Sequence, residues 1–472
     1  MQRRRANVML CRALRRRGDR VFANSPDPIA TPCRYRISPD IDAGPSDQPV
    51  AESNPTREKA MSSPASHAQY RQSAGWLTPQ RIALYASVLL ALQVALVGML
   101  WWKHYVEKFP GVPLLGWDFA VYWSASSLAL SHGPVTAYSW ESLRAMEATL
   151  HLPSFGPFAY PPTFLLMIYP IAAMPFGAAV IVWSLFGVAG YLLFIRAVIA
   201  PISRYWLFPA LAFPGMWLSL VAGQNSLFTL VMGGTALLLI RQRPVLAGAC
   251  IALLCIKPQL GVLFPLFLLC RRHWTAFASA AVFSMLYCGL TWLAFGTDSF
   301  RAFEQALSMF RHVVAENAIG TIRGAPTMFA IWRVSGTPVF TSYLAHTAVA
   351  VLAVATCIRL WCSNARFELS AAALAIATLL LQPYLIYYDL AWLALPIAFL
   401  MIDYARHGAN AWEKSVLIAS WIMPAQAFAV LFVDTMIQWT PIVLIVLLAV
   451  IVRRHVKARQ DVRPMERNVE LC

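Results

Sequence analysis

The stretch IALYASVLLALQVALVGMLWW, residues 82–102, decides the class of this protein. It carries no charged side chain and is long enough for the ~20 helical residues that cross a bilayer. Arginine-rich sequence precedes it, and Trp101, Trp102 and Lys103 form an interfacial belt at its end. We therefore predict a membrane helix that starts in the cytoplasm, with the connection after Lys103 on the other side of the membrane.

The composition of the whole chain agrees with this start. The 472 residues are 59% hydrophobic and only 13% charged, which is far too apolar for a soluble globular protein. We predict an all-α polytopic membrane protein with about 10–13 transmembrane helices. After a span that ends at Ile195, the expected spans are 205–222, 225–240, 244–257, 259–270, 274–295, 338–358, 368–382, 384–402, 414–432 and 437–452.

The net charge indicates which partners the chain binds, and the cysteine pattern indicates how its cysteines are used. The net charge of +16 comes from basic residues that sit mostly in short loops and at the chain ends, which indicates contact with membrane lipids and no nucleic acid. The nine cysteines form no CxxC pair and fall mostly in apolar runs, so we interpret them as small buried side chains.

Three regions follow from these patterns. Residues 1–75 form a basic arm that we expect to be disordered and cytoplasmic, and Met61 leaves an over-extended gene start as an alternative. Residues 76–455 are the transmembrane domain, and 456–472 are a basic cytoplasmic tail. Arginines mark alternate junctions as cytoplasmic, which places both termini inside.

The connection after the first span contains GWDFAVYW, residues 116–123, at the start of the first of two expected amphipathic helices, 118–131 and 139–150. Phe119, Tyr122, Trp123 and Leu130 share one face of the first helix. Asp118 is a carboxylate among aromatic residues, and two explanations compete. It is either a helix N-cap or the general base of a membrane-embedded active site.

Lys257 is the only lysine between Lys108 and Lys414, and it lies in an apolar run beside Pro258. A cation there is costly unless it meets a carboxylate, a phosphate or water. The alternatives are a side chain that reaches the interface and a point charge that binds phosphate.

Other polar residues converge on the same side of the predicted membrane. Gln224 and Asn225 suit sugar hydroxyls or a plain polar turn. Asp389 either binds ligand or pairs with a cation such as Lys257 or Arg323. The 298–335 segment carries mixed charges, as in a lid, a headgroup-binding loop or a solvated loop. No nucleotide-binding or metalloenzyme motif occurs, so we predict no cofactor and no metal.

Several short motifs occur in the order seen in glycosyltransferase family 87, which the chain resembles over about residues 80–455. They are Gly116-Trp117-Asp118-Phe119, Tyr160-Pro161-Pro162, Gly223-Gln224-Asn225, Lys257-Pro258-Gln259, Arg323-Gly324-Ala325-Pro326, and Gln382-Pro383-Tyr384 with Tyr388-Asp389. The resemblance implies the C-type glycosyltransferase fold and an α-mannosyltransferase that uses a polyprenyl-phosphate-linked donor.

It also implies a site on the periplasmic side of the bacterial inner membrane, where a sugar is transferred with inversion to a lipid or glycan acceptor. Asp118 corresponds to the catalytic base, and we expect Lys257 and Arg323 to bind the donor phosphate. The expected substrate-binding residues are Tyr122, Tyr160, Gln224, Asn225, Gln259, Tyr384 and Asp389. The alternative from another class is a transporter or lipid flippase, which an inverted repeat would favour; we find no clear repeat.

Overall fold

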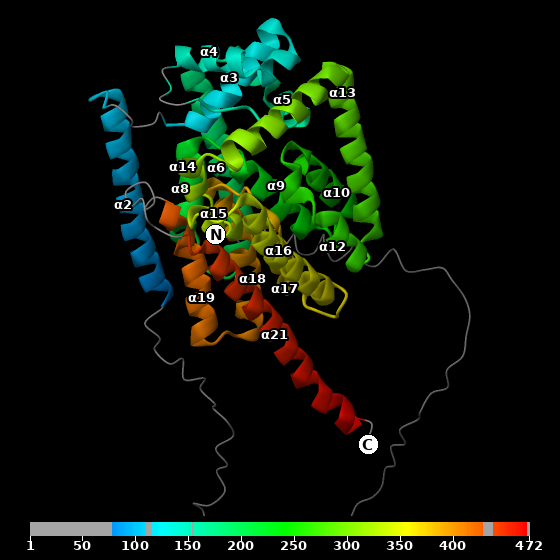
Figure 1. Cartoon of the computed structure of the whole chain (residues 1–472). Coiled ribbons are helices and arrows are strands. Elements are labelled where there is room, and N and C mark those ends of the chain that lie inside the picture. Colours follow the sequence, from blue (N-terminus) through cyan, green and yellow to red (C-terminus); the bar gives the residue numbers. More distant parts are fainter. Residues whose placement is uncertain (1–77, 110–114, 151, 153–154, 428–437, 470–472) are drawn as a thin grey trace, which may run out of the picture. The chain divides into compact units, whose positions relative to one another are not determined.

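The computed structural model describes residues 78–109, 115–150, 152, 155–427 and 438–469, and these ranges consist of helices joined by turns, without a strand (Figure 1). The all-α architecture predicted from the apolar runs is confirmed. The predicted arm, 1–75, lies outside the described residues. The predicted tail continues the last helix, which ends at Val469.

The helices up to residue 261 are α2 (Pro79–Tyr105), α3 (Trp117–His132), η1 (Pro134–Tyr138), α4 (Trp140–Thr149), α5 (Pro162–Ile168), η2 (Tyr169–Ala173), α6 (Phe176–Ile199), α7 (Leu207–Leu211), α8 (Pro214–Ala222), α9 (Ser226–Leu239), α10 (Pro244–Ala252), η3 (Leu253–Ile256) and α11 (Pro258–Gly261). The later ones are α12 (Phe264–Cys270), α13 (Trp274–Phe310), η4 (Arg311–Ala315), α14 (Ile319–Arg323), α15 (Met328–Val334), α16 (Val339–Trp361), α17 (Phe367–Leu381), η5 (Tyr387–Leu393), α18 (Ala394–His407), α19 (Ala411–Ile422), η6 (Met423–Ala425) and α21 (Thr440–Val469).

The membrane character is carried by long apolar helices. Within the described ranges, five helical stretches are long and apolar enough to cross a bilayer: α2, α6, α13 with η4, α16, and η5 with α18. Five further apolar stretches are shorter, including Pro244–Ile256 and Pro258–Cys270, which correspond to the predicted spans at 244–257 and 259–270. The number of helices that cross the membrane stays a prediction.

Proline explains one difference from the predicted spans. The span expected at 205–222 is divided into α7 and α8, and Pro214 is the first residue of α8. Proline lacks an amide hydrogen and clashes with the preceding turn, so it begins a helix more readily than it continues one.

The 298–335 segment, predicted as a loop, is largely helical. It contains the second part of α13 and then η4, α14 and α15. Gly296 has φ +70° and ψ 174°, a backbone conformation that side-chain-bearing residues rarely adopt. The chain therefore turns at this glycine and continues as a second helical segment, which Figure 1 shows as the bend in α13.

The connection between α2 and α6 contains α3 and α4, in agreement with the predicted helices at 118–131 and 139–150. Phe119 and Tyr122 are fully buried, whereas Leu130, near the end of the helix, is 44% exposed. Burial extends around most of α3 because the helix packs against η1, η2, α4 and α5.

Two apolar cores meet near Lys257. The larger one is built from α6, α8–α10, α12, α17, α18 and α21 and includes Leu254 and Leu260. The smaller one gathers α3, α4 and α5 with parts of α6 and α13, and it includes Ile256. The chain at Ile256-Lys257 thus passes from one core to the other, and the polar residues described below lie at this boundary.

A buried ionic cluster joins α18, α19 and α21 near the C-terminal end of α18. Arg454 of α21 is 2.7 Å from Asp403 Oδ2 and 2.8 Å from Glu413 Oε2, and Arg366 Nε is 3.1 Å from Asp403 Oδ1. The two cations and two carboxylates balance, as buried charges require.

Candidate active site

Two glycines bring the start of α3 against the turn between α8 and α9. Gly116 and Gly223 both have left-handed backbones, with φ +81° and +72°. The amide of Gly116 donates to the carbonyl of Val221 at 2.8 Å. A Cβ on Gly223 would lie 2.6 Å from Phe119 Cβ and 3.0 Å from Gly116 Cα. Only glycine allows this approach, and it places Asp118 beside Gln224.

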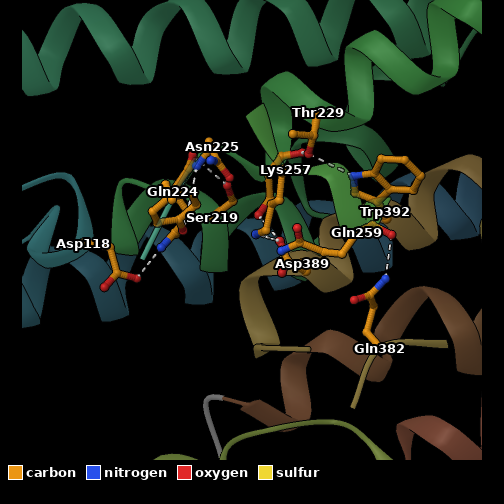
Figure 2. Close-up of polar contacts among 12 residues, drawn as sticks. Asp118, Ser219, Gln224, Asn225, Thr229, Lys257, Gln259, Gln382, Asp389 and Trp392 are labelled. Carbon is orange, nitrogen blue, oxygen red and sulfur yellow. Dashed lines mark hydrogen bonds and ion pairs between the residues drawn. The ribbon is translucent and has the colours of Figure 1, made fainter. Parts of the chain in front are cut away.

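Asp118 does not cap its helix. The helix begins at Trp117, and Gly116 is its N-cap without a side-chain hydrogen bond. The side chain of Asp118 instead accepts a hydrogen bond at Oδ2 from Gln224 Nε2, at 2.8 Å (Figure 2). The N-cap explanation is therefore wrong, because the N-cap position is taken by the left-handed Gly116, two residues earlier. The general-base explanation stays a prediction.

The amide of Gln224 is held from its other end by two tyrosines. The hydroxyls of Tyr122 and Tyr160 both lie within hydrogen-bond distance of Gln224 Oε1, with Tyr160 at 3.1 Å, and they are 2.8 Å from each other. Their rings meet edge to face, with centroids 5.2 Å apart. Four of the predicted site residues thus form one hydrogen-bonded group, which we call the Asp118 cluster: Asp118, Tyr122, Tyr160 and Gln224.

The surroundings of Asp118 shift its proton affinity. Burial raises the pKa of Asp118 to about 6, against the lowering effects of the Gln224 hydrogen bond and the Lys257 charge, while Asp389 raises it further. Asp118 is therefore ionised at neutral pH and is a stronger proton acceptor than a solvated aspartate, as a general base requires.

The second polar group is the pair of Lys257 and Asp389. Lys257 Nζ lies 2.5 Å from Asp389 Oδ1, and Ser226 Oγ donates to the same oxygen at 2.6 Å (Figure 2). Lys257 also lies over the ring of Tyr388, 5.1 Å from its centroid. Both charged residues are 4% exposed, so Lys257 does not reach the interface, and Asp389 pairs with it as the sequence left open.

Asn225 lies in the chain between the two groups. It is fully buried as the N-cap of α9, and neither Oδ1 nor Nδ2 has a hydrogen-bond partner among the described residues. Buried amides are nearly always hydrogen-bonded. Asn225 therefore carries donor and acceptor capacity beside Gln224 and Ser226 that the described residues leave unmet, and its predicted contact with substrate stays a prediction.

Three further predicted site residues form hydrogen bonds outside the Asp118 cluster and the Lys257–Asp389 pair. Tyr384 donates from its hydroxyl to Glu316 Oε1 at 3.2 Å. The side chain of Gln259 is exposed, and the backbone carbonyl of Gln259 accepts a hydrogen bond from Gln382 Nε2 at 2.6 Å. Arg323 ends α14, and its carbonyl accepts from Gln438 at 3.4 Å. Their proposed contacts with substrate stay predictions.

The sequence did not lead us to predict two buried polar residues, Ser226 and Glu147. Ser226 directly follows Gln224 and Asn225, a polar run that could have included it. Glu147 is 2% exposed, and its Oε2 accepts a hydrogen bond from the Gly156 amide at 2.9 Å. Burial raises the pKa of Glu147 to about 7, and Asp118 adds to the rise. The signal was its position four residues after Leu143, on the same face of α4.

Comparison with known families adds an independent finding. The model of glycosyltransferase family 87 matches residues 158–383. This range contains Tyr160, Gln224, Asn225 and Lys257, whereas Asp118 precedes it. No curated protein and no solved structure matches the chain.

Proposed function

We propose that this chain transfers the hexose mannose from a polyprenyl-phosphate-linked donor to a lipid or glycan acceptor, with Asp118 as the general base. The chain belongs to glycosyltransferase family 87 and is a membrane glycosyltransferase. The observation that carries the proposal is the carboxylate of Asp118. Its Oδ2 is held by Gln224, and its Oδ1 accepts no hydrogen bond from the part of the chain that the structure describes.

The proposed reaction is a direct displacement with inversion. The acceptor hydroxyl gives its proton to Asp118 while its oxygen bonds to the anomeric carbon. The bond from that carbon to the phosphate oxygen breaks, and the phosphate leaves on its lipid. No covalent intermediate with the enzyme is needed.

Lys257 is the proposed partner of the leaving phosphate. Because Asp389 already balances its charge, Lys257 contributes N–H donors more than net positive charge. The start of α9, a helix of 14 residues, lies beside the pair through Ser226 and adds the partial positive charge of a helix N-terminus. Developing charge on the phosphate oxygens is stabilised by such preorganised donors.

The proposed location is the bacterial inner membrane, with the site on the periplasmic side and both termini in the cytoplasm. Gln224 and Ser226 lie at the start of α9, whereas Arg241 and Arg243 follow its end. A helix of this length separates them by about 21 Å. The positive-inside rule assigns the arginine turn to the cytoplasm, and the site lies at the far end of α9, toward the opposite side.

The test is an assay of the full-length protein in proteoliposomes with acceptor lipids from a deletion strain. We expect transfer of radiolabelled mannose from polyprenyl-phosphate-mannose and none from GDP-mannose. Transfer from the nucleotide sugar alone would contradict the donor class. Movement of the intact lipid-linked sugar between leaflets without transfer would favour the flippase alternative.

A further inference from the structure

We propose that Gln224 is a positioning residue for Asp118: its amide, fixed by Tyr122, Tyr160 and the Asn225 backbone, occupies one carboxylate oxygen and leaves the other for the acceptor hydroxyl. This role differs from the sugar binding expected for Gln224, and it rests on the proposed function of Asp118.

Hydrogen bonds to Ser219 hold the backbone of Gln224 in place. Its amide donates to the carbonyl of Ser219 at 2.9 Å, and the Ser219 hydroxyl donates to the carbonyl of Gln224 at 3.3 Å. Gly223 fixes the preceding turn against Phe119. The side chain therefore leaves a rigid turn and is itself only 4% exposed.

The hydrogen-bond pattern sets the direction of the amide. The backbone N–H of Asn225, which can only donate, points to Gln224 Oε1 at 3.3 Å. The ionised carboxylate of Asp118, which can only accept, lies 2.8 Å from Nε2. A reversed amide would set oxygen against oxygen at one end and N–H against N–H at the other. The two tyrosine hydroxyls also lie within hydrogen-bond distance of Oε1 and of each other.

Two consequences follow for Asp118. Since Oδ2 is bound, Oδ1 is the oxygen that meets the acceptor. The hydrogen bond from Gln224 also favours the ionised form and lowers the pKa of Asp118 against the effect of burial. Loss of this donor should raise the pKa, and a base that is protonated at neutral pH no longer accepts the acceptor's proton.

The experiment replaces Gln224 by methionine, which keeps length and volume but has no amide. The full-length protein in membranes is titrated by infrared difference spectroscopy, and the Asp118 carboxyl band is identified by its loss in Asp118→Asn. We expect a midpoint near 6 in the unchanged protein and a rise of about one unit in Gln224→Met, the size expected for a lost hydrogen bond to a charged group. Tyr160→Phe, which removes one donor to Oε1, should move the midpoint less in the same direction.

Tyr191→Phe is the matched control, because Tyr191 is a buried tyrosine whose hydroxyl donates to the carbonyl of Ala210 away from the site. It should leave the midpoint unchanged. An unchanged midpoint in Gln224→Met would overturn the proposal, as would a rise in KM for donor without any change in the pH profile of kcat. The infrared readout does not depend on sugar transfer, so a shift without measurable transfer would support the positioning role and count only against the proposed reaction.

Discussion

Lys257 and Asp389 are two buried charges that depend on each other. Removal of one partner of such a pair typically costs about 3–5 kcal/mol, because the other is left buried and uncompensated. A loss of activity in a single Lys257 variant would therefore not distinguish phosphate binding from folding. The distinction needs both members of the pair to be changed together.

We predict that Lys257→Met alone reduces the amount of folded protein, and that Lys257→Met with Asp389→Asn restores it without restoring sugar transfer. Asparagine still accepts the hydrogen bond from Ser226, so the double variant removes mainly the charges. Thermal melts and transfer per folded molecule measure the two effects. Arg301→Met is the control, since its pair with Asp298 is exposed and such pairs contribute little. Normal transfer by the double variant would exclude Lys257 from the reaction.

At the scale of single residues, chemical isolation was the informative signal. Asp118 and Lys257 stood out because each is a charged residue within apolar or aromatic sequence, and both lie in polar clusters. Lys257, which pairs with Asp389, was one of the two cations that the sequence offered as its partner. The burial of Glu147 was not predicted: its position four residues after Leu143 marks the buried face of α4, but its contact with the Gly156 amide has no local signal in the sequence.

At the scale of elements, the contact between α3 and the α8–α9 turn determines whether Asp118 and Gln224 meet. It depends on two left-handed glycines whose backbones touch. The prediction from sequence located both helices but not this contact, since nothing in local periodicity pairs residue 116 with residue 223.

We predict that Gly223→Ala lowers sugar transfer by at least tenfold and destabilises the protein. The added Cβ would overlap Phe119 Cβ, and a left-handed backbone costs a non-glycine residue about 1–2 kcal/mol. Transfer and thermal midpoint in detergent measure the effect. Gly177→Ala is the control, because nothing lies within 4 Å of its added Cβ in α6. Equal transfer by the two variants would mean that the contact does not position the site.

The helix boundaries that were predicted wrongly have local causes. Apolar runs located most helices, but composition alone did not predict the interruption before Pro214 or the helical continuation after Gly296. Both positions are places where the backbone, more than hydrophobicity, sets the boundary.

At the scale of the whole molecule, the all-helical class and the family followed from the apolar runs and the order of the motifs. The count of crossing helices did not, because half-length stretches such as Pro258–Cys270 and Phe367–Leu381 are apolar without being long enough to span alone. Burial among other helices makes such pieces apolar as readily as contact with lipid does.

The predicted sidedness has a direct test in a variant without native cysteines. Cysteine placed at the exposed positions Ala145 and Ser308 should react with an impermeant maleimide in intact spheroplasts, and cysteine at Gln242 only after permeabilisation. Labelling of Gln242→Cys alone in intact cells would place the site in the cytoplasm.

Sugar transfer by Asp118→Asn, normalised to folded protein in membranes, tests the general-base role of Asp118 most directly. Asparagine keeps the shape and can accept the hydrogen bond of Gln224, but it cannot take the acceptor's proton. Glu141→Gln, the same change at an exposed carboxylate of α4, is the control and should retain full activity. If Asp118 is the base, turnover falls by about 10²–10⁴-fold; near-normal turnover in Asp118→Asn would show that Asp118 is not the general base.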